Sequence, residues 1–237
     1  MSTAILSALA EEQEGLLGLL RQPQAVKRAG REFWQGELHG RKVVLALSRI
    51  GKVAAATTAT TLIEAFGVHR VVFTGVAGGL AAAVKVGDVV VASEFVQHDM
   101  DASPIFPRYQ IPLYQKDRFS CDPDLSARLM SAALEGGYRL HQGLIVSGDQ
   151  FVSAAQEAQR LREELGLAGY APLAVEMEGA AVAQVCHDYG IPFAAMRTIS
   201  DRADDSAHVD FPKFVREVAS RYALSIIDGL MQRVPAH

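Results

Sequence analysis

The chain has 237 residues, and 23 Lys and Arg against 27 Asp and Glu give it a formal net charge of −4. Proteins that neutralise phosphates present a basic face, so this balance argues against nucleic acid as a partner. Apolar residues make up 49% of the chain, which suffices for a large core and excludes a disordered protein. The two cysteines, Cys121 and Cys186, are too few for a disulfide framework or a four-cysteine zinc site. We interpret them as buried thiols in a reducing compartment.

The N-terminal apolar run at 4–10 imitates a secretory signal, but no Lys or Arg precedes it. We interpret it as a first strand. No apolar stretch reaches the ~18 residues that span a bilayer. We therefore expect a cytoplasmic protein without a membrane partner.

Strand-like and helix-like segments alternate along the chain. Short apolar or alternating runs predict strands at 3–9, 27–38, 42–48, 70–74, 88–95, 140–146, 173–177 and 193–199. Helices are predicted at 11–21, 53–66, 122–135, 154–165, 179–189 and 212–231. This alternation predicts one α/β domain over 1–237, a three-layer sandwich in which helices flank a mixed, largely parallel central sheet.

The segment 97–118 breaks this alternation. It contains three prolines and five large apolar residues, Ile105, Phe106, Tyr109, Ile111 and Tyr114. A long loop inside a compact domain is usually functional. Because this one is apolar, we expect the part at 104–114 to pack against a second subunit in a homodimer.

Motifs for nucleotides and metals are missing. The turn Gly75-Val76-Ala77-Gly78-Gly79 is not a GxGxxG fingerprint, and Gly51-Lys52 is followed by Val53 rather than by Ser or Thr. His98, Asp99 and Asp101 cluster in sequence without the spacing of a metal site. We expect neither a metal nor a cofactor.

Carboxylates at the ends of apolar strands carry the strongest signal. Glu176 and Glu178 lie at an otherwise apolar strand-to-helix junction, where alternate positions predict that they share one face of an extended strand. Asp201 ends an apolar strand that also holds Arg197. Burying a carboxylate is costly unless it is paired or working. The alternatives are that the two glutamates cap the following helix, and that Asp201 forms a salt bridge or a cap.

Six motifs in one order resemble those of a single enzyme family. They are Ala8-Leu9-Ala10-Glu11-Glu12, Ile50-Gly51-Lys52-Val53-Ala54-Ala55, Gly75-Val76-Ala77-Gly78-Gly79, Ser147-Gly148-Asp149-Gln150-Phe151, Val175-Glu176-Met177-Glu178 and Ser200-Asp201-Arg202-Ala203-Asp204. Together they are similar to the 5'-methylthioadenosine/S-adenosylhomocysteine nucleosidases of the nucleoside phosphorylase superfamily, over about 4–231. The resemblance implies that water cleaves the N-glycosidic bond of 5'-methylthioadenosine, S-adenosylhomocysteine or related 5'-substituted adenosines, and that adenine is released together with the 5'-thioribose.

The resemblance also implies a role for five catalytic residues. Asp201, oriented by Ser200, would protonate N7 of the leaving adenine. Glu12 would activate the attacking water, with Arg197 beside it. Glu178 would bind the ribose 2'- and 3'-hydroxyls. Two carboxylates in opposite protonation states are what glycoside chemistry needs in general.

By the same resemblance, the substrate-binding residues are Val76, Ala77, Gly78, Phe151, Val152, Glu176, Met177 and Phe211. Phe151 would stack on adenine, and the backbone of Val152 would contact its edge. Met177 would lie under the sugar, while Phe211 would line the base pocket. This chain has Val76 where the family commonly has Ser or Thr, and its segment 99–118 differs from the family pattern, so the 5' substituent is left open.

Three other functions remain open. A purine nucleoside phosphorylase-type transferase would need cations around a phosphate, which Arg49, Lys52 and Arg197 could supply, although the acid at position 12 would repel that anion. Hydrolysis of aminofutalosine is the second alternative. The third is a non-catalytic nucleoside-binding relative, because a fold alone does not fix an activity.

Overall fold

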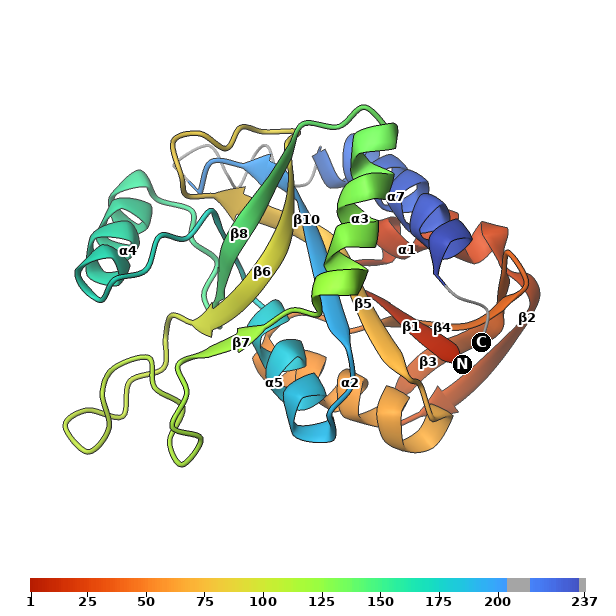
Figure 1. The fold of residues 1–237 in the computed structure, drawn as a ribbon, viewed down its shortest axis with the longest axis horizontal. Helices are drawn as coiled ribbons and strands as arrows, with labels where there is room; N and C mark the ends of the chain where they lie inside the picture. Colours follow the sequence, from red (N-terminus) through yellow and green to blue (C-terminus); the bar gives the residue numbers. More distant parts are fainter. Residues whose placement is uncertain (204–213, 235–237) are drawn as a thin grey trace.

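The computed structural model describes residues 1–203 and 214–234 (Figure 1). The N-terminal half contains β1 (Ser2–Ser7), α1 (Ala10–Leu19), β2 (Arg21–Arg28), β3 (Arg31–Leu38), β4 (Arg41–Leu47), α2 (Lys52–Phe66), β5 (Arg70–Gly79) and β6 (Val89–Gln97). The C-terminal half contains β7 (Arg118–Ser120), α3 (Pro123–Glu135), β8 (Leu140–Ser147), α4 (Ala155–Leu167), β9 (Ala174–Glu176), α5 (Gly179–Tyr189), β10 (Phe193–Asp201), the π-helical segment η1 (Val215–Ala219) and α7 (Ser220–Arg233).

The strands form one mixed sheet that closes on itself. Its order is β10-β6-β8-β9-β5-β1-β4-β3-β2, with β7 on β6 and an additional pairing of β10 with β5. The pairings β10–β6 and β5–β9 are antiparallel, whereas β10–β5, β1–β5 and β8–β9 are parallel. Strand β10 is parallel to β5 and antiparallel to β6, so it brings together two strands that run in opposite directions.

Helices cover both faces of the sheet, as the predicted three-layer sandwich requires. On one face, small residues of α2 and α5 such as Ala59 and Ala183 pack on Phe73 and Phe95 in a shared core. The other face is covered by α1, α3 and α7 through Leu16, Leu129, Ile227 and neighbouring residues. A smaller core lies under α4, which stands apart at the left of Figure 1.

The strand predicted at 27–38 is wrong in one respect, because it is a hairpin of β2 and β3. The turn is at Ala29 and Gly30, which have φ values of 46° and 68°. The helix predicted to reach Arg21 ends at Leu19, and Arg21 begins β2. Pro23 would not fit into a continued helix, because its ring would clash with the carbonyl of Leu19 and it has no N–H to donate to that carbonyl.

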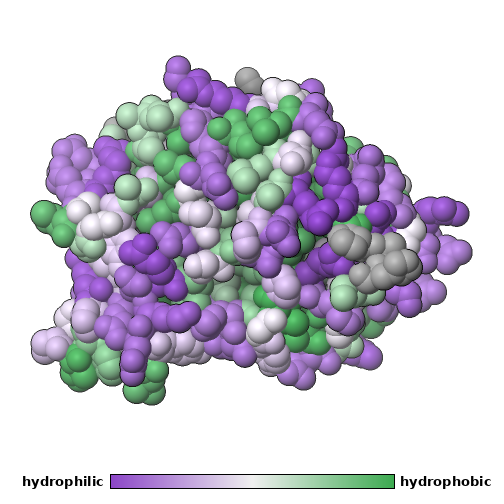
Figure 2. All heavy atoms as spheres, viewed as in Figure 1, coloured by the Kyte–Doolittle hydropathy of each residue, from purple (hydrophilic) through white to green (hydrophobic). Residues whose placement is uncertain are grey.

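The segment 97–118 forms two loops that project from the lower left of Figure 1 and expose apolar atoms at their tips in Figure 2. Of the five large apolar residues, Ile105 is 82% exposed and Tyr114 is 36% exposed, while Tyr109 and Ile111 are buried within the chain. Leu113, a further apolar residue of this segment, is 88% exposed. The apolar residues of the segment therefore divide between the protein's own core and its surface.

Candidate active site

A cavity of about 420 Å³ lies where the ends of β5, β9 and β10 meet. Its described lining comes from six segments of the chain: Ala8, Leu9, Ile50, Val76, Ala77, Gly78, Gln150, Phe151, Val152, Val175, Glu176, Met177, Glu178, Ser200 and Asp201. Each of the six sequence motifs contributes to one of these segments. Pockets of this size and apolar character, with a few polar groups, are typical of small-molecule sites.

The register of three strands explains why the motifs converge. Gly78 is the partner of Val175 across the antiparallel β5–β9 pairing and of Asp201 across the parallel β5–β10 pairing. The end of β9 therefore overlaps the ends of β5 and β10. A Cβ at Gly78 would lie 2.9 Å from Asp201 Oδ1 and from Ala203 Cβ, so the close approach requires glycine there.

Asp201 lies at the wall of the cavity and is 2% exposed. Ser200 Oγ donates to Asp201 Oδ2 at 2.7 Å, and the Ala203 backbone N–H donates to Oδ1 at 2.8 Å. Two donors fix the plane of this carboxyl group. The expected orienting contact of Ser200 on Asp201 is therefore present.

Glu12 combines a structural contact with a free oxygen. Its Oε2 accepts hydrogen bonds from the backbone N–H groups of Ala8 and Leu9, both at 3.0 Å, at the start of α1. Its Oε1 is buried and has no hydrogen-bond partner in the part of the chain that the structure describes. Burial raises the pKa of Glu12 from 4.5 to about 7, against the lowering effects of those N–H groups and of Arg197.

Gly75 separates Glu12 from Arg197 on the face of β5. A Cβ at Gly75 would lie 3.4 Å from Glu12 Oε1 and 3.5 Å from Arg197 Cζ. The carboxylate and the guanidinium therefore border the same bare stretch of backbone. This agrees with the expectation that Arg197 lies beside Glu12.

Glu176 is a structural cap with an internal partner. Its carboxylate accepts hydrogen bonds from the backbone N–H of Glu178 at 3.2 Å and of Gly179 at 2.8 Å, at the start of α5. It also accepts from Ser147 Oγ and pairs with Arg197 Nη2 at 2.8 Å. The capping interpretation holds for this residue, although it also borders the cavity.

Glu178 does not share a strand face with Glu176, because β9 ends at Glu176. Glu178 lies in the turn before α5, where its Oε1 accepts a hydrogen bond from the Gly51 N–H at 2.8 Å. Burial raises the pKa of the Glu178 carboxyl, and the negative charge of Glu176 raises it further. The two glutamates thus have different partners.

The apolar lining matches most of the expected substrate-binding residues. Phe151 is 44% exposed beside buried Val152, and Val76, Ala77 and Met177 complete the wall. Phe211 and Asp204 lie outside the described residues. Five further lining residues were not predicted from the sequence, although all of them belong to the six motifs: Ala8, Leu9, Ile50, Gln150 and Val175.

The cations near the cavity are already engaged. Lys52 Nζ lies 2.6 Å from Asp99 Oδ1, Arg197 pairs with Glu176, and Arg49 donates to the backbone oxygen of Gly30 at 2.6 Å. Among the described lining residues there is no Lys or Arg, while Glu176, Glu178 and Asp201 are acidic. The described lining therefore offers no cation that could hold an anionic co-substrate.

The described residues contain neither a metal-binding cluster nor a membrane-spanning helix. Across 1–203 and 214–234, His, Cys, Asp and Glu form no group of three or more that could hold a metal ion. Within the same ranges, no helix is long and apolar enough to cross a membrane.

Comparisons with known proteins agree with this geometry. The family model of the phosphorylase superfamily matches residues 2–232. A 5'-methylthioadenosine/S-adenosylhomocysteine nucleosidase of Actinobacillus succinogenes is 37% identical over 233 residues, which cover 98% of each chain. The solved structure of a nucleosidase of the same name from Neisseria meningitidis, in complex with methylthio-immucillin-A, has a TM-score of 0.92 at 35% identity and covers 98% of this chain and 99% of its own.

A futalosine hydrolase of Helicobacter pylori is also similar, with a TM-score of 0.91 at 35% identity, covering 99% of this chain and 98% of its own. The match to the family model over nearly the whole chain and the identity to the nucleosidases place the protein in one group. The chain belongs to the 5'-methylthioadenosine/S-adenosylhomocysteine nucleosidase family of the phosphorylase superfamily.

Proposed function

We propose that the protein hydrolyses the N-glycosidic bond of 5'-methylthioadenosine and S-adenosylhomocysteine and releases adenine. The observation that carries this proposal is a pair of separate acids: Asp201 lines an apolar cavity whose described lining has no Lys or Arg, and Glu12 lies behind the lining residues Ala8 and Leu9. Asp201 is held by two donors, and Glu12 has a free oxygen and a pKa of about 7. A general base works best with a pKa near the operating pH.

In this mechanism Asp201 donates a proton to N7 of adenine as the glycosidic bond breaks. Glu12 accepts a proton from the attacking water through Oε1, and the new C1'–OH bond completes the hydrolysis. Glu178 accepts hydrogen bonds from the ribose hydroxyls, while Phe151 stacks on the base. Arg197 acts through Glu176 and through its charge near Glu12, which opposes the burial-driven rise of the Glu12 pKa.

The test is adenine release from 5'-methylthioadenosine by the purified protein in phosphate-free buffer. Hydrolysis predicts turnover that phosphate does not stimulate, with free 5'-methylthioribose as the second product. Turnover only with phosphate, together with a ribose 1-phosphate product, would instead identify a phosphorylase. Binding without any release of adenine would identify a non-catalytic relative.

Aminofutalosine is a second candidate substrate, because a futalosine hydrolase is among the similar structures. The substituents at the 5' position are what separate it from the thioadenosines. A panel of substrates with one adenine and different 5' groups, compared by kcat/KM, ranks them directly. A preference for the futalosine-type substrate would reassign the physiological reaction without changing the chemistry.

We also propose a homodimer that buries the loop 104–114, a cytoplasmic location and a role in methionine salvage. Exposed Ile105 and Leu113 support the dimer. Cys121 and Cys186 are free thiols, which fits a reducing compartment. The thioribose product would retain the sulfur of methionine, which is why salvage is the expected destination.

A further inference from the structure

Two segments that border the cavity are joined by three charged residues that do not line it. The segments are 50–51 and 150–151, and the charged residues are Lys52, Asp99 and Asp149. We propose that these three residues act as positioning residues for nucleoside binding, by fixing the two segments relative to each other. The inference rests on the proposed function for its substrate; we call the three residues the clamp.

Each member of the clamp is hydrogen-bonded to both others. Asp99 Oδ1 accepts from Lys52 Nζ at 2.6 Å, and Asp99 Oδ2 accepts from the Asp149 backbone N–H at 2.9 Å. Asp149 Oδ1 accepts from the Lys52 backbone N–H at 2.7 Å. Three contacts among three residues form a closed triangle, so the loss of one contact loosens the other two.

On both sides the clamp is close in sequence to residues of the active site. Lys52 follows Gly51, whose N–H donates to Glu178 Oε1 at 2.8 Å. Asp149 is followed closely by Phe151 in the cavity wall. A Cβ at Gly51 would lie 3.1 Å from Asp149 Oδ1, and Gly51 has a φ of 94°, so the two backbones approach as closely as glycine allows.

The clamp is also anchored to the rigid part of the fold. Lys52 Nζ donates to Gln97 Oε1 at 3.0 Å at the end of β6, and Gln97 Nε2 donates to Gln184 Oε1 at 2.8 Å in α5. The ring of His98 packs so closely under Gly148 that a Cβ there would lie 2.3 Å from Nε2. The loop that carries Asp149 therefore rests on β6 and has little freedom.

Asp99 accepts both of its hydrogen bonds, and its neighbours favour the ionised carboxylate. Burial opposes its ionisation, but hydrogen bonds from Lys52 and Asp149 hold the pKa of Asp99 below its usual value. The side chains of Lys52 and Asp99 are 16% and 32% exposed. A partly exposed ion pair contributes little to the free energy of folding. We therefore expect the Lys52–Asp99 pair to act mainly on the relative position of segments 50–51 and 150–151, which border the cavity.

The test uses two variants and their combination. Asp99→Asn keeps the shape but turns one of the two acceptor oxygens into a donor facing a donor, and Lys52→Met keeps the length but removes the ammonium. With 5'-methylthioadenosine, each should raise KM on the order of tenfold, the worth of a charge-assisted hydrogen bond, with kcat changed less than twofold. The double variant should match the worse single one, because both break the same triangle.

A second cycle separates positioning from general loosening. If the clamp acts through the ring of Phe151, then Asp99→Asn adds little to the KM of Phe151→Ala. A purely structural effect would lower the Tm and leave KM unchanged at temperatures well below unfolding. Asp149→Ala provides a third entry point, since it removes the acceptor of the Lys52 N–H.

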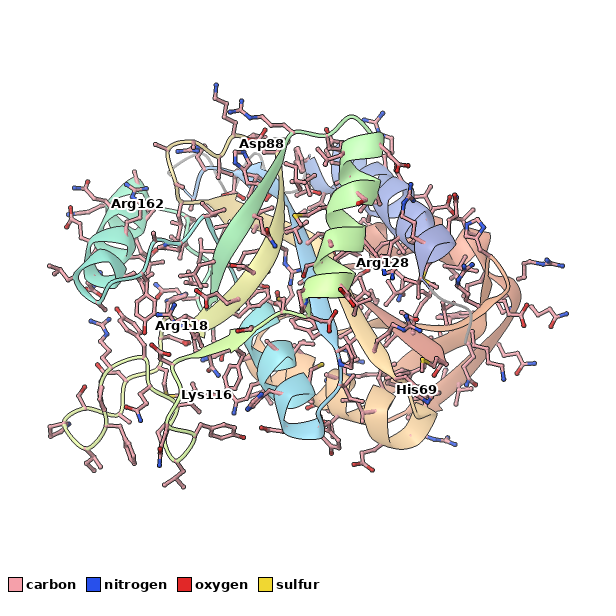
Figure 3. All side chains as sticks on the ribbon, in the orientation of Figure 1. His69, Asp88, Lys116, Arg118, Arg128 and Arg162 are labelled. Atoms are coloured by element: carbon pink, nitrogen blue, oxygen red, sulfur yellow. The ribbon has the colours of Figure 1, made fainter. Side chains whose placement is uncertain are left out.

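The control is Glu94→Gln, which breaks a similar pair on β6, the strand that precedes Asp99. Glu94 Oε1 lies 3.0 Å from Arg118 Nη1, and neither residue lines the cavity; Figure 3 shows Arg118 near β7. Its KM should equal that of the parent. KM values within twofold of the parent for Asp99→Asn and Lys52→Met, or full additivity with Phe151→Ala, would overturn the clamp.

Failure of the proposed function gives a different pattern. In that case the parent releases no adenine, and the same variants are compared by the Kd of 5'-methylthioadenosine from calorimetry. The clamp then predicts a tenfold higher Kd, and an unchanged Kd would overturn it.

Discussion

Arg197 Nη2 lies 2.8 Å from Glu176 Oε2, and the two side chains are 1% and 3% exposed. The guanidinium lies over the ring of Phe73 at 4.1 Å, and its Nη1 donates to the backbone oxygens of Phe73 and Met196. Glu176 in turn caps α5, so this ion pair joins β10 to the turn that carries Glu178. The pair therefore holds the backbone next to Glu178, and Glu176 also borders the cavity.

Breaking that pair should destabilise the protein. In Arg197→Met the carboxylate of Glu176 is left buried without its cation, and the free energy of unfolding should fall by about 3–5 kcal/mol. The double variant Arg197→Met/Glu176→Gln should recover part of this loss, because the unpaired charge is gone. Urea unfolding of the three proteins measures both effects; a single variant within about 1 kcal/mol of the parent would contradict the assignment.

Replacement of Glu12 should separate turnover from binding. Glu12→Gln can still accept the Ala8 and Leu9 hydrogen bonds but cannot take a proton from water. We expect kcat to fall by ~10²–10⁴-fold with the substrate Kd retained, and the parent's kcat/KM to decline as pH falls through about 7. Near-normal turnover in Glu12→Gln would reduce this residue to a helix cap.

The raised pKa of Glu12 also affects folding. Burial raises it from 4.5 to about 7, so between these values the folded protein holds a proton that the unfolded chain has released. The stabilisation that this proton gives to the folded state is fully present below pH 4.5 and is lost as pH rises through about 7. Glu12→Gln lacks this dependence, so its free energy of unfolding relative to the parent should increase between pH 5 and pH 8, on the order of a few kcal/mol. Urea titrations at both values check the sign, and a constant difference would speak against a raised pKa.

Asp201 should determine both acid catalysis and the choice of base. Its two oxygens accept from Ser200 and Ala203, and a protonated carboxyl that bridges N7 and the 6-amino group donates one hydrogen bond and accepts the other. Asp201→Asn cannot deliver a proton and should lose ~10²–10⁴-fold in kcat. The parent should reject the inosine analogue, which presents an acceptor where a donor is needed. Adenine and hypoxanthine release are measured separately; full activity of Asp201→Asn, or equal use of both bases, would place the acid elsewhere.

The proposed dimer should respond to charge on the projecting loops. Ile105→Glu/Leu113→Glu places two carboxylates where an interface of at least ~1,000 Å² is expected. Sedimentation velocity should show a dimer for the parent and a monomer for this variant. Leu167→Glu is the matched control. Leu167 is 91% exposed, which is similar to the exposure of Ile105 and Leu113, but it lies at the end of α4. A fully active monomeric parent would remove the proposal.

The strand and helix pattern was predictable from local sequence, since apolar periodicity reports which face each element buries. The alternation of strands and helices indicated the layers, and the buried acids indicated the site. The closure of the sheet was not predictable in this way, because the pairing of Gly78 with both Val175 and Asp201 joins residues far apart in the chain. The partner of Glu176 depends on the same long-range contacts. Sequence spacing alone suggested one shared strand face for Glu176 and Glu178. In the structure the strand ends at Glu176, and Glu178 lies in the turn before α5.

The bare backbone at Gly75 has a consequence for the space beside Glu12. A methyl group there would meet Glu12 Oε1 at 3.4 Å and Arg197 Cζ at 3.5 Å, which are ordinary contacts that the fold tolerates. The same methyl would lie against the carboxylate oxygen that has no hydrogen-bond partner in the described structure. Gly75→Ala would therefore fill space next to the oxygen proposed to take a proton from water, while the scaffold around it stays intact.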